Sequence, residues 1–177
     1  KDDSVYVVIG DATGHGMTAG MMVSITKAGL YGTPPNIPPN EVSYILNRTI
    51  KAIELGKNKM AISIARFWSD RLELTSAAMP PLYHYKSSTE NVDERLLEGL
   101  PLGSFKGETY GQLEISSEPG DAFVFISDGL PEATNKSEEM LGYEAVLDCV
   151  RENGKNSAEE IKQSLFDLGS AWLDGIQ

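Results

Sequence analysis

Two aspartates stand at the ends of apolar segments, and each is followed by glycine-containing sequence that favours a turn. Asp11 follows residues 5–10, and Asp128 follows residues 122–127. Both segments are apolar enough to predict buried strands, and the segment before Asp128, the most apolar of the chain, predicts a central strand. Each strand would hold a carboxylate at the edge of a core. Hard divalent cations prefer oxygen ligands, so the sequence predicts a metal-dependent hydrolase.

The glycines after Asp11 have a geometric use beside such a cation. Small residues let the backbone fold tightly there, so that the carbonyl oxygen of Ala12 can turn toward the ion that Asp11 binds. On local sequence alone a second interpretation is equally good, in which Asp11 caps the helix expected over residues 15–31. Asp128 has a comparable alternative as an ordinary turn former before Gly129, although a central strand that ends in an acid favours a functional role.

Residues 14–19 also match the dinucleotide-binding pattern G-x-G-x-x-A between a strand and a helix. That pattern requires a second strand with an acidic end about twenty residues later, and the proline-rich residues 33–39 occupy that place. No lysine follows the glycines, so a phosphate-binding P-loop is not supported either. The histidines form no catalytic triad: His15 orients a water or ligand beside Asp11 or caps the helix, and His84 is expected to be structural.

Composition and charge narrow the classes of function. The chain has 177 residues, enough for one domain with a substantial core, and a net charge of −11. This charge argues against a nucleic-acid partner, because phosphate backbones bind basic patches. No run of about twenty apolar residues exists, so we expect no membrane contact. The single cysteine, Cys149, excludes an internal disulfide, is expected to be core or half-buried, and is typical of a reducing cytoplasm.

The hydrophobic periodicity changes along the chain from helical to strand-like and back to helical. It predicts strands over residues 5–11, 60–68, 72–77, 82–85, 110–115 and 122–128, and helices over residues 15–31, 41–55, 141–153 and 157–172. Asn40 is the expected N-cap of the second helix, and Ser157 with Glu160 predicts a capping box for the last one. The polar residues 87–99 predict a mobile loop. These elements predict one mixed domain of mainly antiparallel strands with helix pairs.

Four motifs follow one another in an order that resembles a known family. Residues 10–16 read G-D-A-T-G-H-G, and residues 100–103 read L-P-L-G. Residues 74–82 are similar to L-T-x-A-x-A-G-H-P-P-x-L, with Met79 where histidine is common. Residues 119–133 are similar to P-G-D…Y-T-D-G-(V/L)-x-E-A. Together the motifs resemble the PPM-type (type 2C) serine/threonine protein phosphatases, and most closely their SpoIIE/RsbU-like branch.

This resemblance implies a fold and a chemistry. The fold is α+β, an αββα sandwich of two mainly antiparallel sheets flanked by helix pairs. The family's site holds two Mn²⁺ or Mg²⁺ ions, and Asp11 matches the aspartate that bridges both. Ala12 matches the residue whose backbone carbonyl completes one site, and Asp128 matches a ligand of one metal. A metal-held water attacks the phosphorus of phosphoserine or phosphothreonine, which makes Asp11 and Asp128 the expected catalytic residues.

The resemblance also implies parts that residues 1–177 do not include. The family usually opens with a strand bearing G-G-D-(W/Y)-Y-D and closes with D-D-x-T, whose aspartate is normally a metal ligand. We therefore expect residues 1–177 to form a single SpoIIE-like phosphatase domain that lacks its first and last strands. The missing ligand leaves poor metal binding and inactivity open as one outcome for residues 1–177 alone. The alternative, from another class, is a catalytically inactive signalling or interaction module of the same fold.

Partners follow from the same branch. The resemblance implies a phosphorylated protein substrate similar to an anti-sigma-factor antagonist, in a bacterial stress or developmental switch. It also implies an upstream sensor domain, and a homodimer is a further expectation. The cytoplasmic location that we expect rests instead on the single cysteine, which is typical of a reducing compartment.

Overall fold

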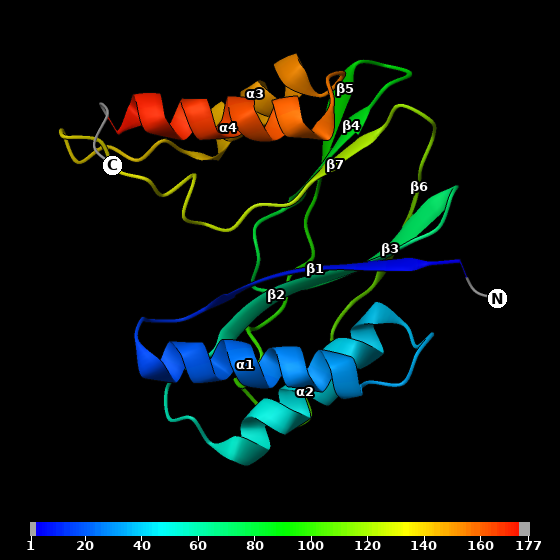
Figure 1. Cartoon of the computed structure of the whole chain (residues 1–177), viewed down its shortest axis with the longest axis vertical. Helices are drawn as coiled ribbons and strands as arrows, with labels where there is room; N and C mark the ends of the chain where they lie inside the picture. Colours follow the sequence, from blue (N-terminus) through cyan, green and yellow to red (C-terminus); the bar gives the residue numbers. More distant parts are fainter. Residues whose placement is uncertain (1–2, 174–177) are drawn as a thin grey trace. The chain divides into compact units, whose positions relative to one another are not determined.

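The structure is a computed structural model that describes residues 3–173. Within this range the chain forms seven strands and four helices (Figure 1). These elements belong to two compact units. The first runs up to Met79 and includes Leu97–Ser117, and the second comprises Pro80–Leu96 and the residues from Glu118 onward. We call them the Asp11 unit and the Asp128 unit, after the candidate site residue in each. A single domain over residues 1–177 stays a prediction.

The Asp11 unit contains a four-stranded sheet in the order β1-β2-β3-β6, in which all neighbours are antiparallel. Its strands are β1 (Val5–Ala12), β2 (Met60–Phe67), β3 (Arg71–Ala77) and β6 (Leu113–Ser116), and its helices are α1 (Met17–Gly32) and α2 (Pro39–Ile53). Figure 1 shows both helices on one face of this sheet. The core between them includes Met22, Leu46 and Ile62, which are at most 1% exposed.

Strand β1 divides its side chains between the two faces of the sheet. Tyr6 and Ala12 pack against the core under the helices. Because side chains alternate along a strand, Asp11 lies on the opposite face. The expectation that this strand is buried is wrong, since Val5 is 62% exposed. The reason is its place at an edge of the sheet: among the described strands, β1 pairs only with β2.

The Asp128 unit contains a three-stranded antiparallel sheet in the order β5-β4-β7. Its strands are β4 (Leu82–Lys86), β5 (Asn91–Arg95) and β7 (Ala122–Val124), and its helices are α3 (Tyr143–Asn153) and α4 (Ala158–Trp172). The core of the unit includes Tyr83, Tyr85, Val146 and Val150. Cys149 is partly buried beside this core, as predicted.

Strand β5 lies in the segment predicted as a mobile loop, so that prediction is wrong. It forms a hairpin with β4, and the Asp93 carboxylate accepts hydrogen bonds from Lys86 at 2.7 Å and Arg95 at 2.6 Å. The strand was hard to recognise because Val92 is its only buried residue. Its pairing therefore depends on backbone bonds and cross-strand charges, which leave no hydrophobic period in the sequence.

Strand β7 is shorter than predicted and is not central. It ends at Val124 instead of Asp128, and within residues 3–173 it pairs only with β4. The apolar segment still marks burial, because Ile126 is only 8% exposed although it lies outside any strand. The apolar run thus correctly predicted a buried residue at Ile126, but it incorrectly predicted that residues 125–128 pair as part of a strand.

Helix starts show two different solutions to capping. Helix α2 begins at Pro39, with Pro38 as N-cap, so the expected cap at Asn40 is wrong. Proline fits the first helical position because its fixed φ suits the helix and its missing N–H would have no partner there. In contrast, the predicted capping box at the start of α4 is confirmed, since Ser157 and Glu160 bond each other's backbone.

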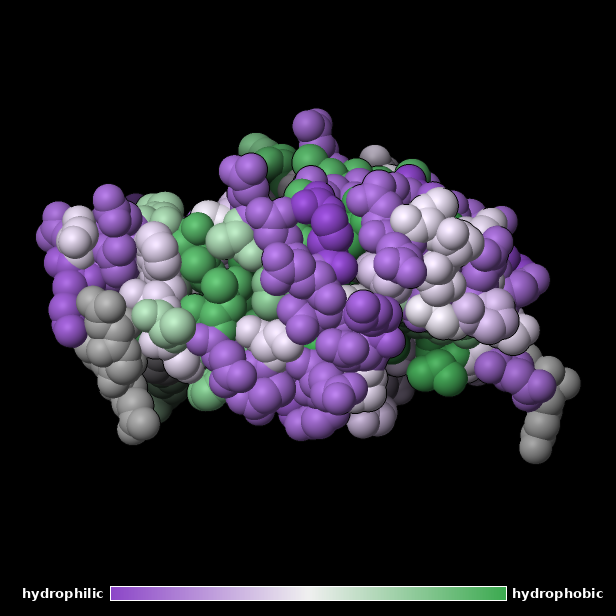
Figure 2. Space-filling view, turned by 90° about the horizontal axis from the view of Figure 1, so that it is seen from above, coloured by the Kyte–Doolittle hydropathy of each residue, from purple (hydrophilic) through white to green (hydrophobic). Residues whose placement is uncertain are grey.

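Two antiparallel sheets and two helix pairs confirm the predicted α+β class. The face shown in Figure 2 is mostly hydrophilic, in keeping with a chain that is 23% charged residues. Within the described residues, no helix combines the length and the apolar character needed to cross a membrane.

Candidate metal site

Asp11 is the penultimate residue of β1 and stands opposite Ala61 of β2. Its side chain is exposed, and within residues 3–173 its carboxylate makes no hydrogen bond or ion pair. The alternative in which Asp11 caps α1 is wrong, because Gly16 is the N-cap and no side chain of the described residues caps this helix. A charged oxygen ligand on a paired strand is thus free to bind a cation.

The direction of the backbone N–H and C=O groups of Ala12 follows from the hydrogen bonds of Met60, which lies opposite Ala12 on β2. Met60 donates its N–H to the Leu102 carbonyl at 3.1 Å and accepts the Leu102 N–H at 2.8 Å. The opposed pair Ala12–Met60 is therefore not hydrogen-bonded to each other, and the polar backbone groups of Ala12 face away from β2. The Ala12 carbonyl therefore points away from β2 next to Asp11, and its role as a metal ligand stays a prediction.

Two glycines let the chain turn sharply between these ligands and α1. Gly14 and Gly16 have φ angles of 83° and 78°, a left-handed region that residues with a side chain rarely adopt. The intervening His15 is exposed, and its suggested role in orienting a water or ligand stays a prediction.

Asn58 and Lys59 hold the same turn from a distant part of the sequence. The Asn58 side-chain amide donates to the Thr13 carbonyl at 2.7 Å, and the Lys59 N–H donates to the Thr13 hydroxyl at 2.8 Å. Reasoning from sequence missed both residues, since they lie 45 and 46 positions from Thr13 and belong to no recognised motif.

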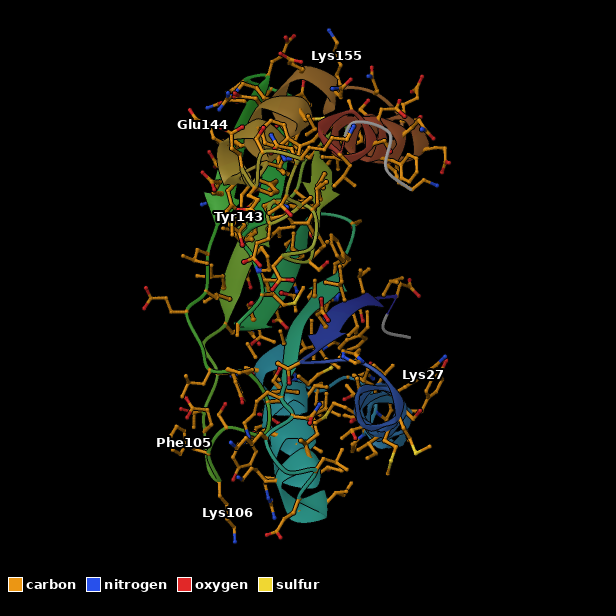
Figure 3. All side chains as sticks on the ribbon, turned by 90° about the vertical axis from the view of Figure 1, so that its left-hand side faces the viewer. Lys27, Phe105, Lys106, Tyr143, Glu144 and Lys155 are labelled. Carbon is orange, nitrogen blue, oxygen red and sulfur yellow. The ribbon has the colours of Figure 1, made fainter. Side chains whose placement is uncertain are left out.

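Asp128 lies in a turn of the Asp128 unit, and its side chain is exposed. Its backbone carbonyl accepts the N–H of Glu132 at 2.9 Å, and the Gly142 N–H donates to the Pro131 carbonyl at 2.8 Å. The second bond ties the start of α3, where Figure 3 labels Tyr143, to the turn. Burial raises the pKa of Tyr143, and the negative charges of Glu132 and Asp128 raise it further. A phenol that stays protonated therefore lies near two carboxylates.

His84 has the structural role that the sequence predicted. It is 1% exposed, its Nε2 lies 2.9 Å from the Asp121 carboxylate, and its ring stacks on Phe123 at 4.4 Å. Burial alone would raise the pKa of Asp121, but hydrogen bonds from His84, Ser87 and Glu118 outweigh it and lower the pKa to about 2. This pair fixes the residue that precedes β7.

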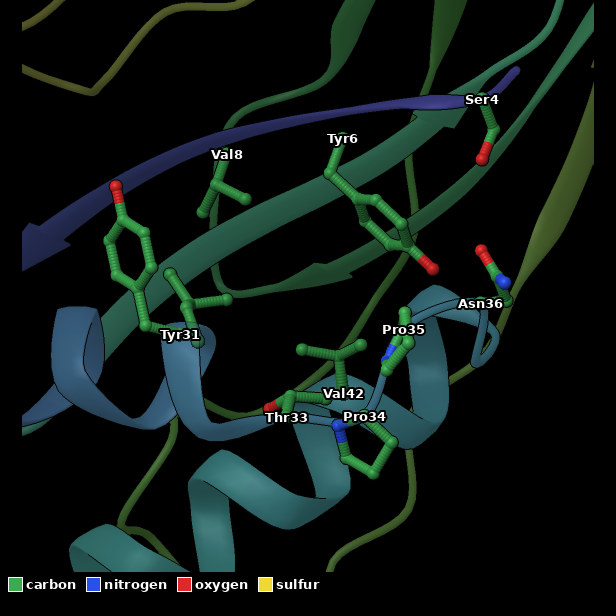
Figure 4. A pocket seen from close by; sticks show the side chains of 10 residues that line it. Ser4, Tyr6, Val8, Tyr31, Thr33, Pro34, Pro35, Asn36 and Val42 are labelled. Atoms are coloured by element: carbon green, nitrogen blue, oxygen red, sulfur yellow. The ribbon is translucent and has the colours of Figure 1, made fainter. Parts of the chain in front are cut away.

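A pocket of about 550 Å³ lies elsewhere in the Asp11 unit (Figure 4). It is bounded by β1 and the connection between α1 and α2, with Tyr6, Val8, Tyr31 and Pro35 among its walls. Among residues 3–173, no carboxylate, histidine or cysteine lines it, and Asp11 lies on the other face of β1. The pocket is therefore separate from the Asp11 carboxylate.

The donors that sequence reasoning selected fit a hard cation. Asp11, Ala12 and Asp128 offer oxygen atoms only, and both carboxylates are exposed. Asp11 and Ala12 are neighbours on one strand, whereas Asp128 belongs to the other unit, so their joint binding of one centre stays a prediction. Within residues 3–173, no three His, Cys, Asp or Glu side chains gather in a metal-binding group.

Two solved structures resemble this chain in fold over most of its length. The SiaA-PP2C domain of Pseudomonas aeruginosa matches with a TM-score of 0.79 and 17% identity, over 96% of this chain and 74% of that one. The RsbU and RsbW domains of Rv1364c from Mycobacterium tuberculosis match with a TM-score of 0.80 and 19% identity, over 94% of this chain and 48% of that one. At such identities the likeness establishes the fold, and the predicted PP2C phosphatase fold is confirmed.

Metal ions accompany this fold in other similar structures. The catalytic domain of the serine/threonine phosphatase PstP, in complex with two manganese ions, has a TM-score of 0.70 and 14% identity, over 96% of this chain and 81% of that one. RsbX in complex with magnesium has a TM-score of 0.71 and 17% identity, over 98% of this chain and 78% of that one. The expectation of Mn²⁺ or Mg²⁺ is thus confirmed for proteins of this fold.

Sequence comparison decides the family. No curated protein sequence matches the chain. The model of the family described as stage II sporulation protein E (SpoIIE) matches residues 1–172, nearly the whole chain, which confirms the family that the motifs predicted. The chain therefore belongs to the SpoIIE family and has the fold of the PP2C-type protein phosphatases.

Proposed function

We propose that this chain is a metal-dependent phosphoprotein phosphatase that hydrolyses phosphoserine or phosphothreonine on a partner protein. Its membership of the SpoIIE family over residues 1–172 carries the proposal. The carboxylate of Asp11, which is exposed and has no partner within residues 3–173, supports it, because a ligand without a competing partner needs no rearrangement to bind a cation.

Three residues would hold the metal ions in this proposal. The carboxylates of Asp11 and Asp128 and the backbone carbonyl of Ala12 are the ligands. Bound Mn²⁺ or Mg²⁺ would supply a nucleophilic water at neutral pH and neutralise the phosphoryl oxygens. The contribution of the chain is to hold these oxygen atoms on strand ends and tight turns, with the Asp11 carboxylate accessible to a phosphorylated side chain.

The partner belongs to the same proposal. We infer a substrate similar to an anti-sigma-factor antagonist in a stress or developmental switch, acted on in the cytoplasm, with a sensor domain upstream and a homodimer as further expectations. The similar RsbU domain, which was solved together with an RsbW domain, supports a regulatory protein partner. The net charge of −11 supports a protein rather than a nucleic acid as the bound molecule.

Substitution of Asp11 tests the catalytic assignment. With Mn²⁺ and an aryl phosphate substrate, Asp11→Asn should lose at least about 10³-fold in kcat, because metal catalysis contributes several kcal/mol. Asp70→Asn is the matched control, since the Asp70 carboxylate is exposed and, within residues 3–173, bonds only the side chain of its neighbour Arg71. Full activity in Asp11→Asn would contradict the assignment, whereas a wild-type protein without metal-dependent hydrolysis would favour the interaction module.

A further inference from the structure

Thr13, the residue after Ala12, has all its polar groups bonded to one distant segment. Its N–H donates to the Lys59 carbonyl at 3.0 Å, and its carbonyl accepts the Asn58 amide at 2.7 Å. Its hydroxyl accepts the Lys59 N–H at 2.8 Å. A residue held at three atoms has little freedom to rotate about its backbone torsions.

The held N–H of Thr13 also determines the direction of the neighbouring carbonyl. Ala12 C=O and Thr13 N–H belong to the same planar trans peptide group, in which they point in opposite directions. Because the Thr13 N–H points to Lys59, the Ala12 carbonyl must point away from Lys59. The pairing of Met60 with Leu102 leads independently to the same direction.

The segment that holds Thr13 is itself fixed to a helix. The Lys59 ammonium group donates to the Gly103 carbonyl at 2.6 Å, and the Gly103 N–H donates to Asn47 Oδ1 at 2.7 Å. Asn47 belongs to α2, is fully buried, and donates its own amide to the Phe105 carbonyl at 2.9 Å. Hydrogen bonds that run through Lys59, Gly103 and Asn47 therefore connect the turn after Ala12 to α2.

We propose that Asn58 and Thr13 are positioning residues that aim the carbonyl oxygen of Ala12 at a bound divalent cation. This inference rests on the proposed function, because it requires Ala12 to be a metal ligand. Neither side chain is proposed to touch the metal or the substrate: Asn58 acts through the Thr13 carbonyl, and the Thr13 hydroxyl acts through Lys59. Partners that orient ligands in this way typically contribute 10- to 100-fold to metal affinity.

Metal titration of matched variants tests this role. Asn58→Ala and Thr13→Val should each raise the Kd for Mn²⁺, measured by calorimetry, by about 10-fold. The Mn²⁺ concentration for half-maximal hydrolysis of an aryl phosphate should rise equally, and kcat at saturating Mn²⁺ should stay within about 2-fold, as the ligand is misdirected but not removed. Thr13→Ser should restore the wild-type Kd, because it keeps the hydroxyl.

Two controls separate this role from a general loss of structure. Asn153→Ala removes a similar amide bond, from Asn153 to the Cys149 carbonyl at 2.9 Å, and Thr33→Val removes a hydroxyl bond to Gly29 at 2.8 Å. Both should leave the Kd for Mn²⁺ unchanged. If Asn58→Ala folds poorly, Thr13→Val against Thr13→Ser decides the question.

The outcomes for this inference and for the proposed function are distinct. An unchanged Kd in Asn58→Ala and Thr13→Val, beside an Asp11→Asn variant that no longer binds Mn²⁺, would overturn the positioning role alone. A Thr13→Ser variant as weak as Thr13→Val would also overturn it, because the hydroxyl would then not matter. A wild-type protein that binds no Mn²⁺ would overturn both proposals.

Discussion

The turns that carry Asp11 and Asp128 are held in different ways. The Asn58 side chain and the Lys59 backbone, 45 and 46 residues away, hold the turn after Asp11, at the end of an eight-residue strand. Backbone bonds within residues 128–142 hold the turn at Asp128, which follows a three-residue strand. The Asp11 turn should therefore respond to single changes at its clamping side chains, and the Asp128 turn to changes in the packing of its unit.

In the Asp128 unit, the largest effect is expected from removal of the proposed metal ligand Asp128. Asp128→Asn should reduce kcat with Mn²⁺ by about 10³-fold, since the lost charge weakens one metal position. High Mn²⁺ should restore part of this loss, whereas Asp11→Asn, which affects both metals in the proposal, should not recover. Equal recovery of the two variants would remove the proposed difference between the two aspartates.

The same variant can be followed without an activity assay. Loss of the Asp128 charge should lower the pKa of Tyr143, because that charge is one cause of its rise, although burial remains the larger cause. Spectrophotometric titration of the tyrosines against a Tyr143→Phe reference measures the shift. Asp148→Asn, an exposed carboxylate that bonds Arg151, is the control and should leave Tyr143 unchanged.

A smaller effect, on stability, should come from overpacking the core of the Asp128 unit at Gly154. A Cβ at Gly154 would lie 2.3 Å from the Tyr85 ring, which is 2% exposed, so Gly154→Ala should lower the free energy of unfolding by about 3 kcal/mol. Gly103→Ala in the Asp11 unit should cost about 1–2 kcal/mol because of its φ of 87°.

The two tryptophans allow these losses to be assigned to a unit. Trp68 lies in the Asp11 unit and Trp172 in the Asp128 unit, so variants with only one tryptophan report each unit in urea unfolding. Gly154→Ala should shift mainly the Trp172 transition, and Gly103→Ala mainly the Trp68 transition. Equal shifts of both transitions in both variants would show that the two units unfold as one.

The sequence predicted the elements of both regions unequally well. Strand β1 and helix α1 were found within two residues of their observed ends, because a long apolar run before glycines is a strong local signal. Strand β5 was missed because only Val92 is buried there. Strand β7 was predicted too long for the opposite reason, since Ile126 is buried although it does not belong to a strand.

The candidate ligands were predictable and their supports were not. Asp11, Ala12 and Asp128 stand in local motifs, so one sequence suffices to select them. The bonds from Asn58 to Thr13 and from His84 to Asp121 join positions 45 and 37 residues apart. Such pairs depend on how strands are registered in the folded sheet, and local spacing contains no information about that register.

At low pH we expect a moderate loss of stability, caused by protonation of Asp121, the residue before β7. The pKa of Asp121 is lowered to about 2 in the folded chain, whereas the ordinary pKa of an aspartate is near 4. The ionised carboxylate therefore stabilises the fold fully only at pH values above about 4. This stabilisation, about 2 kcal/mol, should be lost as the pH falls from about 5 to 2.

Asp121→Asn removes the group that titrates, so its effect depends on pH. The difference in unfolding free energy between wild type and variant should be largest near pH 6 and shrink toward pH 2, when Trp172 is the reporter. Asp93→Asn is the comparison, since hydrogen bonding by Lys86 lowers the pKa of Asp93 at a more exposed site. A difference for Asp121→Asn that does not vary with pH would contradict the role of its charge.

The smallest effect should come from the cap of α4, the helix whose Trp172 donates to the Ala133 carbonyl at 3.0 Å near the Asp128 turn. Ser157→Ala removes the capping box and should cost about 1 kcal/mol, because one helical N–H loses its partner. The pKa of Glu160, which hydrogen bonds from Ser157 lower, should rise toward its ordinary value. Ser164→Ala, inside the same helix, should be close to neutral. Because the cap lies in the Asp128 unit, only the Trp172 transition should shift, and a shift at Trp68 of equal size would argue against separately held turns.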